Sequence, residues 1–233
     1  MNRYSHVHGY FDREIVLLIG RPCFWGKCTF CDYIDDNSLD KDFIVSQNSK
    51  ILKNITGQYK VLEVINSGSV FEIPKETLSQ IREIVREKNI EKLIFEAHYA
   101  YRNRLDEIRD FFGEIEVYFK TGVETFDNYF REEVLLKNAK FETFQEVEKY
   151  FDSVCLLVGI KGQTREMIER DLEICRDHFK WITVNIFIEN TTPVKRDEEL
   201  VEWFTKKYRY LEKDRRYEIL FEYTDFGVGE ILV

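Results

Sequence analysis

Three cysteines near the start of the chain are the residues best suited to chemistry. Cys23, Cys28 and Cys31 lie within nine residues of one another, separated by gaps of four and then two residues. Three thiolates this close can bind three corners of a cubane iron–sulfur cluster, because iron prefers soft sulfur ligands. The fourth iron would keep an open position for a chelating ligand. The spacing, and the odd total of five cysteines, therefore predict a cluster site and not a set of disulfides.

The same cysteines could instead hold a structural zinc ion in a protein without catalytic activity. Zinc normally takes four tetrahedral ligands, so the fourth would be His6, His8 or Asp32. Zinc ligands usually come as two pairs on separate turns, and no second pair follows in this sequence. Cys155 lies in an expected apolar strand and Cys175 in an expected helix, where we expect buried thiols that bind no metal. We therefore favour the cluster and keep zinc as an alternative.

The elements that position the cysteines are predicted by alternating patterns. Short apolar runs, rich in β-branched residues, alternate with amphipathic segments of helical length. This order predicts an α/β fold with a parallel sheet covered by helices. The cysteine loop would then lie where the strands end, at the edge that holds ligands in such folds. The expected strands are 15–19, 61–65, 92–95, 116–119, 154–158 and 182–188, and the expected helices follow Pro74 and cover 104–112, 144–151, 164–179 and 196–208.

Composition limits the class of protein. The 233 residues are 44% hydrophobic, which can fill one substantial core, and no Pro-rich or Gly/Ser-rich linker divides them. We expect a single domain over residues 1–233, with 1–13 as an N-terminal extension and 210–233 as a last strand or cap. The net charge of −9 is a poor match to nucleic acid or an anionic membrane. Without a leader or a membrane span, a cytoplasmic protein is expected.

The cysteine loop and the turns after later strands resemble the radical S-adenosylmethionine (SAM) superfamily. In that family three cysteines after the first strand bind a 4Fe-4S cluster, and an aromatic residue, here Phe30, precedes the last cysteine. The family's commonest first gap is three residues, so the gap of four departs from it. The segment Ser67-Gly68-Ser69 resembles the turn that contacts the SAM amino group, Glu124 the acid near the SAM ribose, and Gly159 with Ile160 the segment that lines adenine.

Each of these turns has a plainer interpretation when taken alone. Ser67-Gly68-Ser69 could be an ordinary turn between a strand and a helix, Glu124 could be a charge favoured by a helix N-terminus, and Gly159 could permit a tight turn. Their order behind the cysteine loop is what supports the resemblance.

The resemblance implies a fold and a mechanism. The fold is a partial (β/α)6 radical SAM barrel. The mechanism is chelation of the open iron by SAM, followed by one-electron reduction, with flavodoxin or ferredoxin as the expected donor. The cleaved SAM gives methionine and a 5′-deoxyadenosyl radical, which takes a hydrogen atom from the substrate. The protein must exclude water and hold the substrate carbon close to that radical.

Within the superfamily, the chain resembles the branch that contains the radical SAM partner of archaeosine synthase, which acts on a 7-deazaguanine held in tRNA. Its short length and acidic charge fit a free base better than tRNA. In these respects it resembles the bacterial queuine lyases, which cut the carbon–nitrogen bond of queuine to release preQ1. The alternative is another radical SAM enzyme, acting on tRNA or on a different small heterocycle.

Substrate residues are expected at the strand ends and in the tail. A deazaguanine presents two hydrogen-bond donors on its Watson–Crick edge, and a carboxylate can accept both. A tyrosine ring could stack on the base, although most aromatic residues of this chain serve the core. The candidates are Glu96, His98, Tyr99, Asn185, Asp225 and Tyr223.

Overall fold

The computed structural model describes residues 2–32, 36–222 and 225–228. Its centre is an eight-stranded sheet in which the strands follow one another in chain order. β1 pairs antiparallel with β2, and β2 to β8 are parallel. The α/β prediction is confirmed. The strands are β1 (Tyr4–Val7), β2 (Arg13–Leu18), β3 (Val61–Asn66), β4 (Lys92–Glu96), β5 (Glu116–Glu124), β6 (Ser153–Val158), β7 (Trp181–Ile186) and β8 (Tyr217–Leu220).

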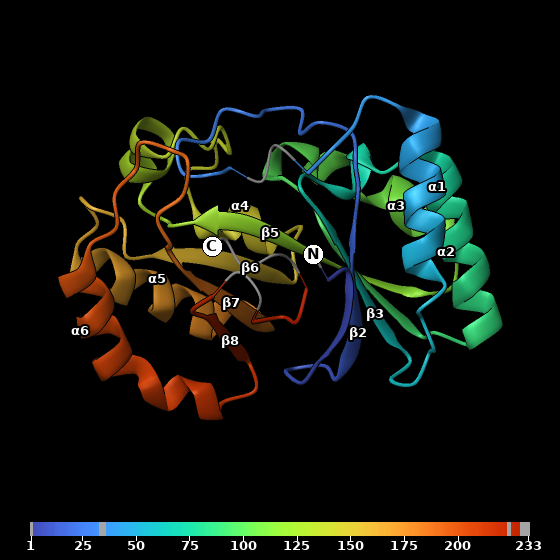
Figure 1. Cartoon of the computed structure of the whole chain (residues 1–233). Coiled ribbons are helices and arrows are strands. Elements are labelled where there is room, and N and C mark those ends of the chain that lie inside the picture. Colours follow the sequence, from blue (N-terminus) through green and yellow to red (C-terminus); the bar gives the residue numbers. More distant parts are fainter. Residues whose placement is uncertain (1, 33–35, 223–224, 229–233) are drawn as a thin grey trace.

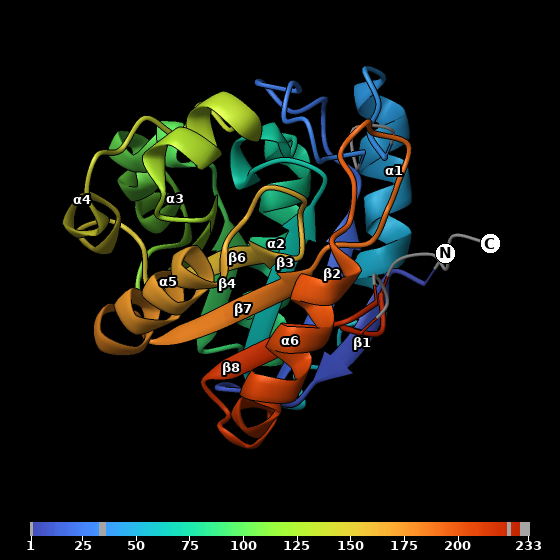
Figure 2. The ribbon, with the colours of Figure 1, turned by 90° about the vertical axis from the view of Figure 1, so that its left-hand side faces the viewer.

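The sheet curls into a half-barrel, and the helices lie on its outer side (Figures 1 and 2). All five expected helices are present, and α1 is an addition that the sequence patterns did not predict. The α-helices are α1 (Lys41–Leu52), α2 (Lys75–Lys88), α3 (Leu105–Phe112), α4 (Phe144–Glu148), α5 (Arg165–His178) and α6 (Glu198–Tyr208). Shorter helical turns are η2 (Val70–Glu72), η3 (Tyr99–Arg104), η4 (Phe130–Val134) and η5 (Arg209–Lys213).

The two faces of the sheet differ in polarity. Alternate strand residues, such as Val64 and Phe95, point outward into the main hydrophobic core beneath the helices. The inner face carries buried charges instead: Glu63 accepts hydrogen bonds from Arg13 Nε (2.5 Å) and Lys120 Nζ (2.6 Å). These groups neutralise one another, which is the condition for burying charge. The interior of the half-barrel therefore holds a polar cluster, next to apolar side chains such as Ile94 and Trp181.

Helix α1 was not predicted because a polar residue interrupts the apolar pattern of its buried face. Asn48 is fully buried beside Ile44 and Ile51. Its amide accepts a hydrogen bond from Ile19 N (2.9 Å) and donates one to Ile19 O (2.8 Å). Asn48 thus satisfies the backbone at the point where the chain leaves β2 and enters the cysteine loop.

The two ends of the described chain meet. β1 forms an edge strand, and Asn2 Nδ2 donates to Gly227 O (2.5 Å). Val228 is buried against Val7 and Ile15. Residues 217–220 form the expected last strand, and Tyr223 lies outside the described residues. Within the described ranges, no helix has the length and apolar character needed to span a bilayer.

Candidate active site

The carboxyl ends of the parallel strands gather the predicted cofactor residues at one edge of the sheet. The cysteine loop follows β2, Ser67 follows β3, Glu124 ends β5, and Gly159 follows β6. Figures 1 and 2 both place the blue loop after β2 and the yellow-green segment after β5 at the same end of the sheet. The parallel register of β2 to β7 explains why segments far apart in sequence meet there.

The cysteine loop is held by hydrogen bonds from two distant segments. Thr29 donates its N–H to Leu135 O (3.0 Å) and its hydroxyl to Val134 O (2.8 Å). On the other side, Asn190 Nδ2 donates to Phe30 O (2.8 Å). The position of the cysteines therefore depends on the segment after β5 and on the loop after β7.

The turn after β3 is joined to the cysteine loop by Glu72, which sequence reasoning missed. Its buried carboxylate accepts hydrogen bonds from Ser69 N (2.5 Å) and from the Tyr101 hydroxyl (2.7 Å), and its carbonyl accepts one from Arg21 N (2.9 Å). Burial raises the pKa of Glu72. The spacing of Ser69 and Glu72 is that of a capping box, a signal that could have been recognised in the sequence.

The other two residues of this turn also lie against neighbouring loops. Ser67 donates its hydroxyl to Asp36 O (2.6 Å). A Cβ added at Gly68 would stand 3.1 Å from the Glu72 carboxylate, so the turn passes close to that side chain. A small residue is required here because the backbone and the carboxylate share little space.

Glu124 lies in an ion pair within the site. Its backbone has a left-handed φ of 63°, at a shift in the register between β5 and β6. Its carboxylate is 2.6 Å from Lys137 Nζ, and the two side chains are only 7% and 13% exposed. A Cβ on Gly122 would collide with the Glu124 carboxylate, which explains the glycine at that position. Lys137 was not predicted from sequence.

His98 connects three segments of the site. Its N–H donates to Ser69 Oγ (2.9 Å), its Nε2 bonds Lys137 O (2.9 Å), and its Nδ1 accepts from Ala100 N (3.1 Å). These partners assign the tautomer with the proton on Nε2. Burial lowers the pKa of His98 to about 4, so the ring is neutral at neutral pH. Both ring nitrogens are occupied by backbone groups.

Gly159 and Ile160 form a tight turn that Gln163 closes. Gly159 has a φ of 98°, and the Gln163 side chain accepts hydrogen bonds from Gly159 N (2.9 Å) and Ile160 N (3.0 Å). Ile160 is buried in a small apolar cluster against which Phe30 packs. The structure thus brings together the aromatic residue of the cysteine loop and the turn predicted to line adenine.

Among the predicted substrate residues, Glu96 has a partly exposed side chain at the end of a central strand. It ends β4 beside Lys120 on β5, with which it pairs in the sheet register. Its carboxylate is 3.3 Å from Lys120 Nζ, and its side chain is 32% exposed while that of Lys120 is fully buried. Burial raises the pKa of Glu96. Glu96 therefore presents an accessible acid at the rim of the polar interior.

The remaining predicted substrate residues differ in their surroundings. Asn185 is half-buried on β7, between Leu157 and Leu220 of the neighbouring strands. Asp225 closes a turn after β8 by accepting the N–H groups of Phe221 and Glu222 (2.6 and 3.0 Å). The prediction that Tyr99 stacks on a substrate is wrong. That ring is 2% exposed in the main core, where it contacts Phe141 and Phe151.

The two histidines considered for zinc lie far from the cysteines. His6 pairs with Glu14 near the start of β2, whereas the cysteine loop follows the end of that strand. His8 contacts Asp12. This placement at the opposite end of β2 argues against either histidine as the fourth ligand of a zinc ion on the cysteine loop. Within residues 2–32, 36–222 and 225–228, no three His, Cys, Asp or Glu side chains converge as ligands of one ion.

The residues present fit an iron–sulfur cluster. Cys23, Cys28 and Cys31 are half-buried and provide three soft donors on one short loop. Burial raises the pKa of the Cys28 thiol to about 12, while the positive charge of Lys137 acts in the opposite direction. Cys175 is fully buried in the main core, whereas Cys155 is buried on β6, where the charges of Lys120, Glu96 and Glu124 act on its thiol.

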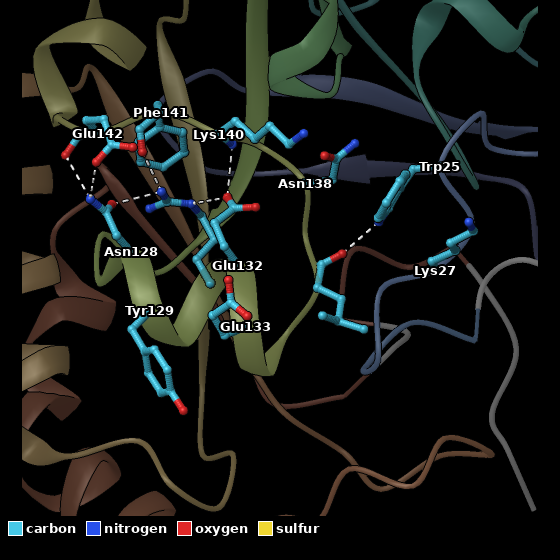
Figure 3. A pocket seen from close by; sticks show the side chains of 12 residues that line it. Trp25, Lys27, Asn128, Tyr129, Glu132, Glu133, Asn138, Lys140, Phe141 and Glu142 are labelled. Atoms are coloured by element: carbon cyan, nitrogen blue, oxygen red, sulfur yellow. Dashed lines mark hydrogen bonds and ion pairs between the residues drawn. The ribbon is translucent and has the colours of Figure 1, made fainter.

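A hollow of about 840 Å³ opens on the outer side of the cysteine loop (Figure 3). Trp25 and Lys27 line one wall, and Asn128 and Tyr129 line another. Trp25 Nε1 donates to Leu136 O (2.6 Å), which ties the loop to this wall. The lining contains none of the predicted cluster or SAM residues, so the hollow lies beside the candidate site and not within it.

Comparison with known proteins identifies the family. No protein-family model and no curated protein matches the chain. A queuine lyase from Clostridium spiroforme, solved bound to SAM and queuine, is 51% identical with a TM-score of 0.96, over 99% of this chain and 100% of that one. A radical SAM methyltransferase from Sphaerobacter thermophilus, 15% identical with a TM-score of 0.60 over 89% of this chain and 65% of that one, shares the fold alone. The chain therefore belongs to the queuine lyase family of radical SAM enzymes.

Proposed function

We propose that this protein is a queuine lyase, which cleaves the carbon–nitrogen bond of queuine and releases preQ1. The observation that carries the proposal is the 51% identity, over almost the whole of both chains, to a queuine lyase bound to SAM and queuine. The arrangement of the cysteine loop and of the turns after β3, β5 and β6 supports it, because all of them meet at one edge of the half-barrel.

The cofactors would be held by residues of that edge. Cys23, Cys28 and Cys31 would hold a 4Fe-4S cluster, and the SAM contacts would come from Phe30 and from the residues that follow β3, β5 and β6. When bound, the cluster and SAM together supply a 5′-deoxyadenosyl radical. The chain's own task is to keep water out, which the apolar cluster of Ile160, Phe130 and Phe187 with Phe30 serves. The assigned SAM residues are Phe30, Ser67, Gly68, Ser69, Glu124, Gly159 and Ile160.

The substrate would lie against the inner face of the half-barrel, below the cofactor edge. Glu96 offers a carboxylate whose oxygen atoms can accept the N–H donors of a deazaguanine. Lys120, buried beneath it, holds that carboxylate in place and favours its charged form. Asn185 is half-buried on β7, on the same inner face of the sheet, and would supply a second polar group.

The reaction also needs a one-electron donor, for which flavodoxin or ferredoxin is expected. A cytoplasmic location of the enzyme agrees with such a donor. Nucleic acid is not an expected partner, since the net charge of −9 would oppose contact with a phosphate backbone.

The proposal is tested by product analysis under anaerobic conditions. Reconstituted protein is incubated with SAM, dithionite and queuine, and preQ1 is measured by mass spectrometry. We expect preQ1 and 5′-deoxyadenosine to form together, and neither to form without SAM. Formation of 5′-deoxyadenosine without preQ1 would contradict the substrate assignment. A parallel incubation with tRNA that contains queuosine then distinguishes a lyase for the free base from an enzyme that acts on tRNA.

A further inference from the structure

Lys137 places a buried positive charge beside the cysteine loop. Its Nζ is 2.6 Å from the Glu124 carboxylate and 5.5 Å from the centre of the Phe30 ring, and its side chain is 13% exposed. The charge of Lys137 also acts electrostatically on Cys28 and Cys31. Water is largely excluded from this ammonium group, so its electrostatic effect is screened far less than that of a surface lysine.

The backbone around Lys137 is fixed to the same loop. Leu135 O and Leu136 O accept hydrogen bonds from Thr29 and Trp25 of the cysteine loop. Lys137 O bonds the ring of His98 (2.9 Å), and Lys137 N donates to Arg131 O (3.0 Å). The main chain on both sides of the ammonium group is therefore anchored, and Glu124 holds the end of the side chain.

A charge in this position affects reduction of the cluster that the proposed function requires. A cluster held by three thiolates gains one negative charge when it accepts an electron, and a nearby buried cation stabilises the more negative state. The net charge of −9 on the whole chain acts against reduction. Lys27 is also in the loop, but it is exposed and lies over the Trp25 ring, so solvent screens its charge.

We propose that Lys137 is the internal counter-charge of the cluster, and that it favours the reduced state while Glu124 fixes its position. The inference rests on the proposed function, because it presupposes a cluster on the three cysteines. It concerns the electron-transfer property of the site and does not depend on which substrate the enzyme cleaves.

The experiment measures the midpoint reduction potential of the reconstituted protein, without SAM or queuine, by anaerobic spectroscopic titration. We expect Lys137→Met to keep its iron and to show an about tenfold lower ratio of reduced to oxidised cluster at a fixed potential. Tenfold corresponds to a shift of about 59 mV to more negative values for one electron. Lys137→Arg should restore the potential. Lys27→Met removes an exposed charge from the same loop and should leave the potential unchanged.

A second variant tests the inference independently of how Lys137→Met folds. Glu124→Gln removes the negative partner and leaves Lys137 charged, so the potential should move in the positive direction. An unchanged potential in iron-loaded Lys137→Met would overturn the inference, and so would a negative shift in Glu124→Gln. Neither result bears on the identity of the substrate. The substrate assignment fails in a different way, if the unaltered protein contains its cluster but forms no preQ1.

Discussion

Glu63 and Glu96 are two acids that contact the same lysine and have different roles. Glu63 is fully buried, which by itself would raise the pKa of its carboxyl, but the hydrogen bonds and positive charges of Arg13 and Lys120 hold that pKa below its usual value. Glu96 is further from Lys120, at 3.3 Å, and is partly exposed. The contact with Lys120 uses only part of the hydrogen-bonding capacity of the Glu96 carboxylate, so oxygen lone pairs remain for a ligand. Glu63 thus stabilises the fold, while Glu96 is available to a ligand.

The role of Glu96 can be measured at the level of one side chain. We expect Glu96→Ala to raise the KM for queuine roughly tenfold or more, because a hydrogen bond to a charged group contributes about 1.5–3 kcal/mol. Reductive cleavage of SAM in the absence of queuine should continue. Glu91→Ala, an exposed acid just before the start of β4, is the matched control and should leave the KM unchanged. An unaltered KM in Glu96→Ala would remove this residue from the substrate site.

The sequence predicted candidate site residues where they belong to short local patterns, and it gave no signal for residues that act across the fold. The cysteines, Phe30 and Glu124 stand in or beside recognisable turns. Lys137 has no such pattern: it contacts Glu124 across an irregular segment and reaches a loop more than 100 residues earlier. Its neighbours Leu136 and Asn138 adopt left-handed backbone angles, so no helical periodicity marks the segment.

Helix α5 supports the turn that carries Glu124. The helix begins as predicted, with Thr164 capping Met167 N (3.2 Å). Further along, the carboxylate of Asp171 accepts a hydrogen bond from Phe126 N (2.8 Å), two residues after Glu124. Asp171 is 3% exposed, and burial raises its pKa to about 7.

The raised pKa of Asp171 predicts how stability depends on pH. Because the folded protein binds this proton more tightly than the unfolded chain, the contribution is complete below the ordinary pKa near 4 and is lost as pH rises to about 7. Asp171→Asn keeps an oxygen acceptor for Phe126 and carries no charge. We expect the variant to lose this part of the decline in the free energy of unfolding between pH 4 and pH 8.

Urea unfolding of both proteins at several pH values measures the effect. Because one pKa unit corresponds to about 1.4 kcal/mol, a contribution of the order of 4 kcal/mol is expected. Equal slopes of stability against pH in the two proteins would show that Asp171 does not titrate in this range.

Strands were easier to predict than the segments between them. Each expected strand is a run of apolar, β-branched residues that the structure buries against helices, so the pattern and the burial have the same cause. α1 was missed because its buried face includes Asn48, whose role is to bond the backbone of Ile19. A polar residue that serves a distant loop weakens the local pattern by which a helix is recognised.

The half-barrel separates two environments. Its outer face forms the hydrophobic core, and its inner face carries charges from Arg13 and Glu63 through Lys120 to Glu96, with Glu124 and Lys137 at the cofactor edge. The opposite charges of this series allow it to stay buried. The polar interior suits a heterocycle with several hydrogen-bond donors, which an apolar interior would exclude.

The central claim is that the three cysteines bind the cluster on which SAM cleavage and queuine cleavage depend. The most direct measurement compares Cys28→Ala with Cys175→Ala, a buried cysteine outside the site, in iron content and in preQ1 formation under anaerobic conditions. We expect the unaltered protein and Cys175→Ala to contain about four irons per chain and to form preQ1, and Cys28→Ala to lose both. A Cys28→Ala protein that keeps its iron and still releases preQ1 from queuine would contradict the account.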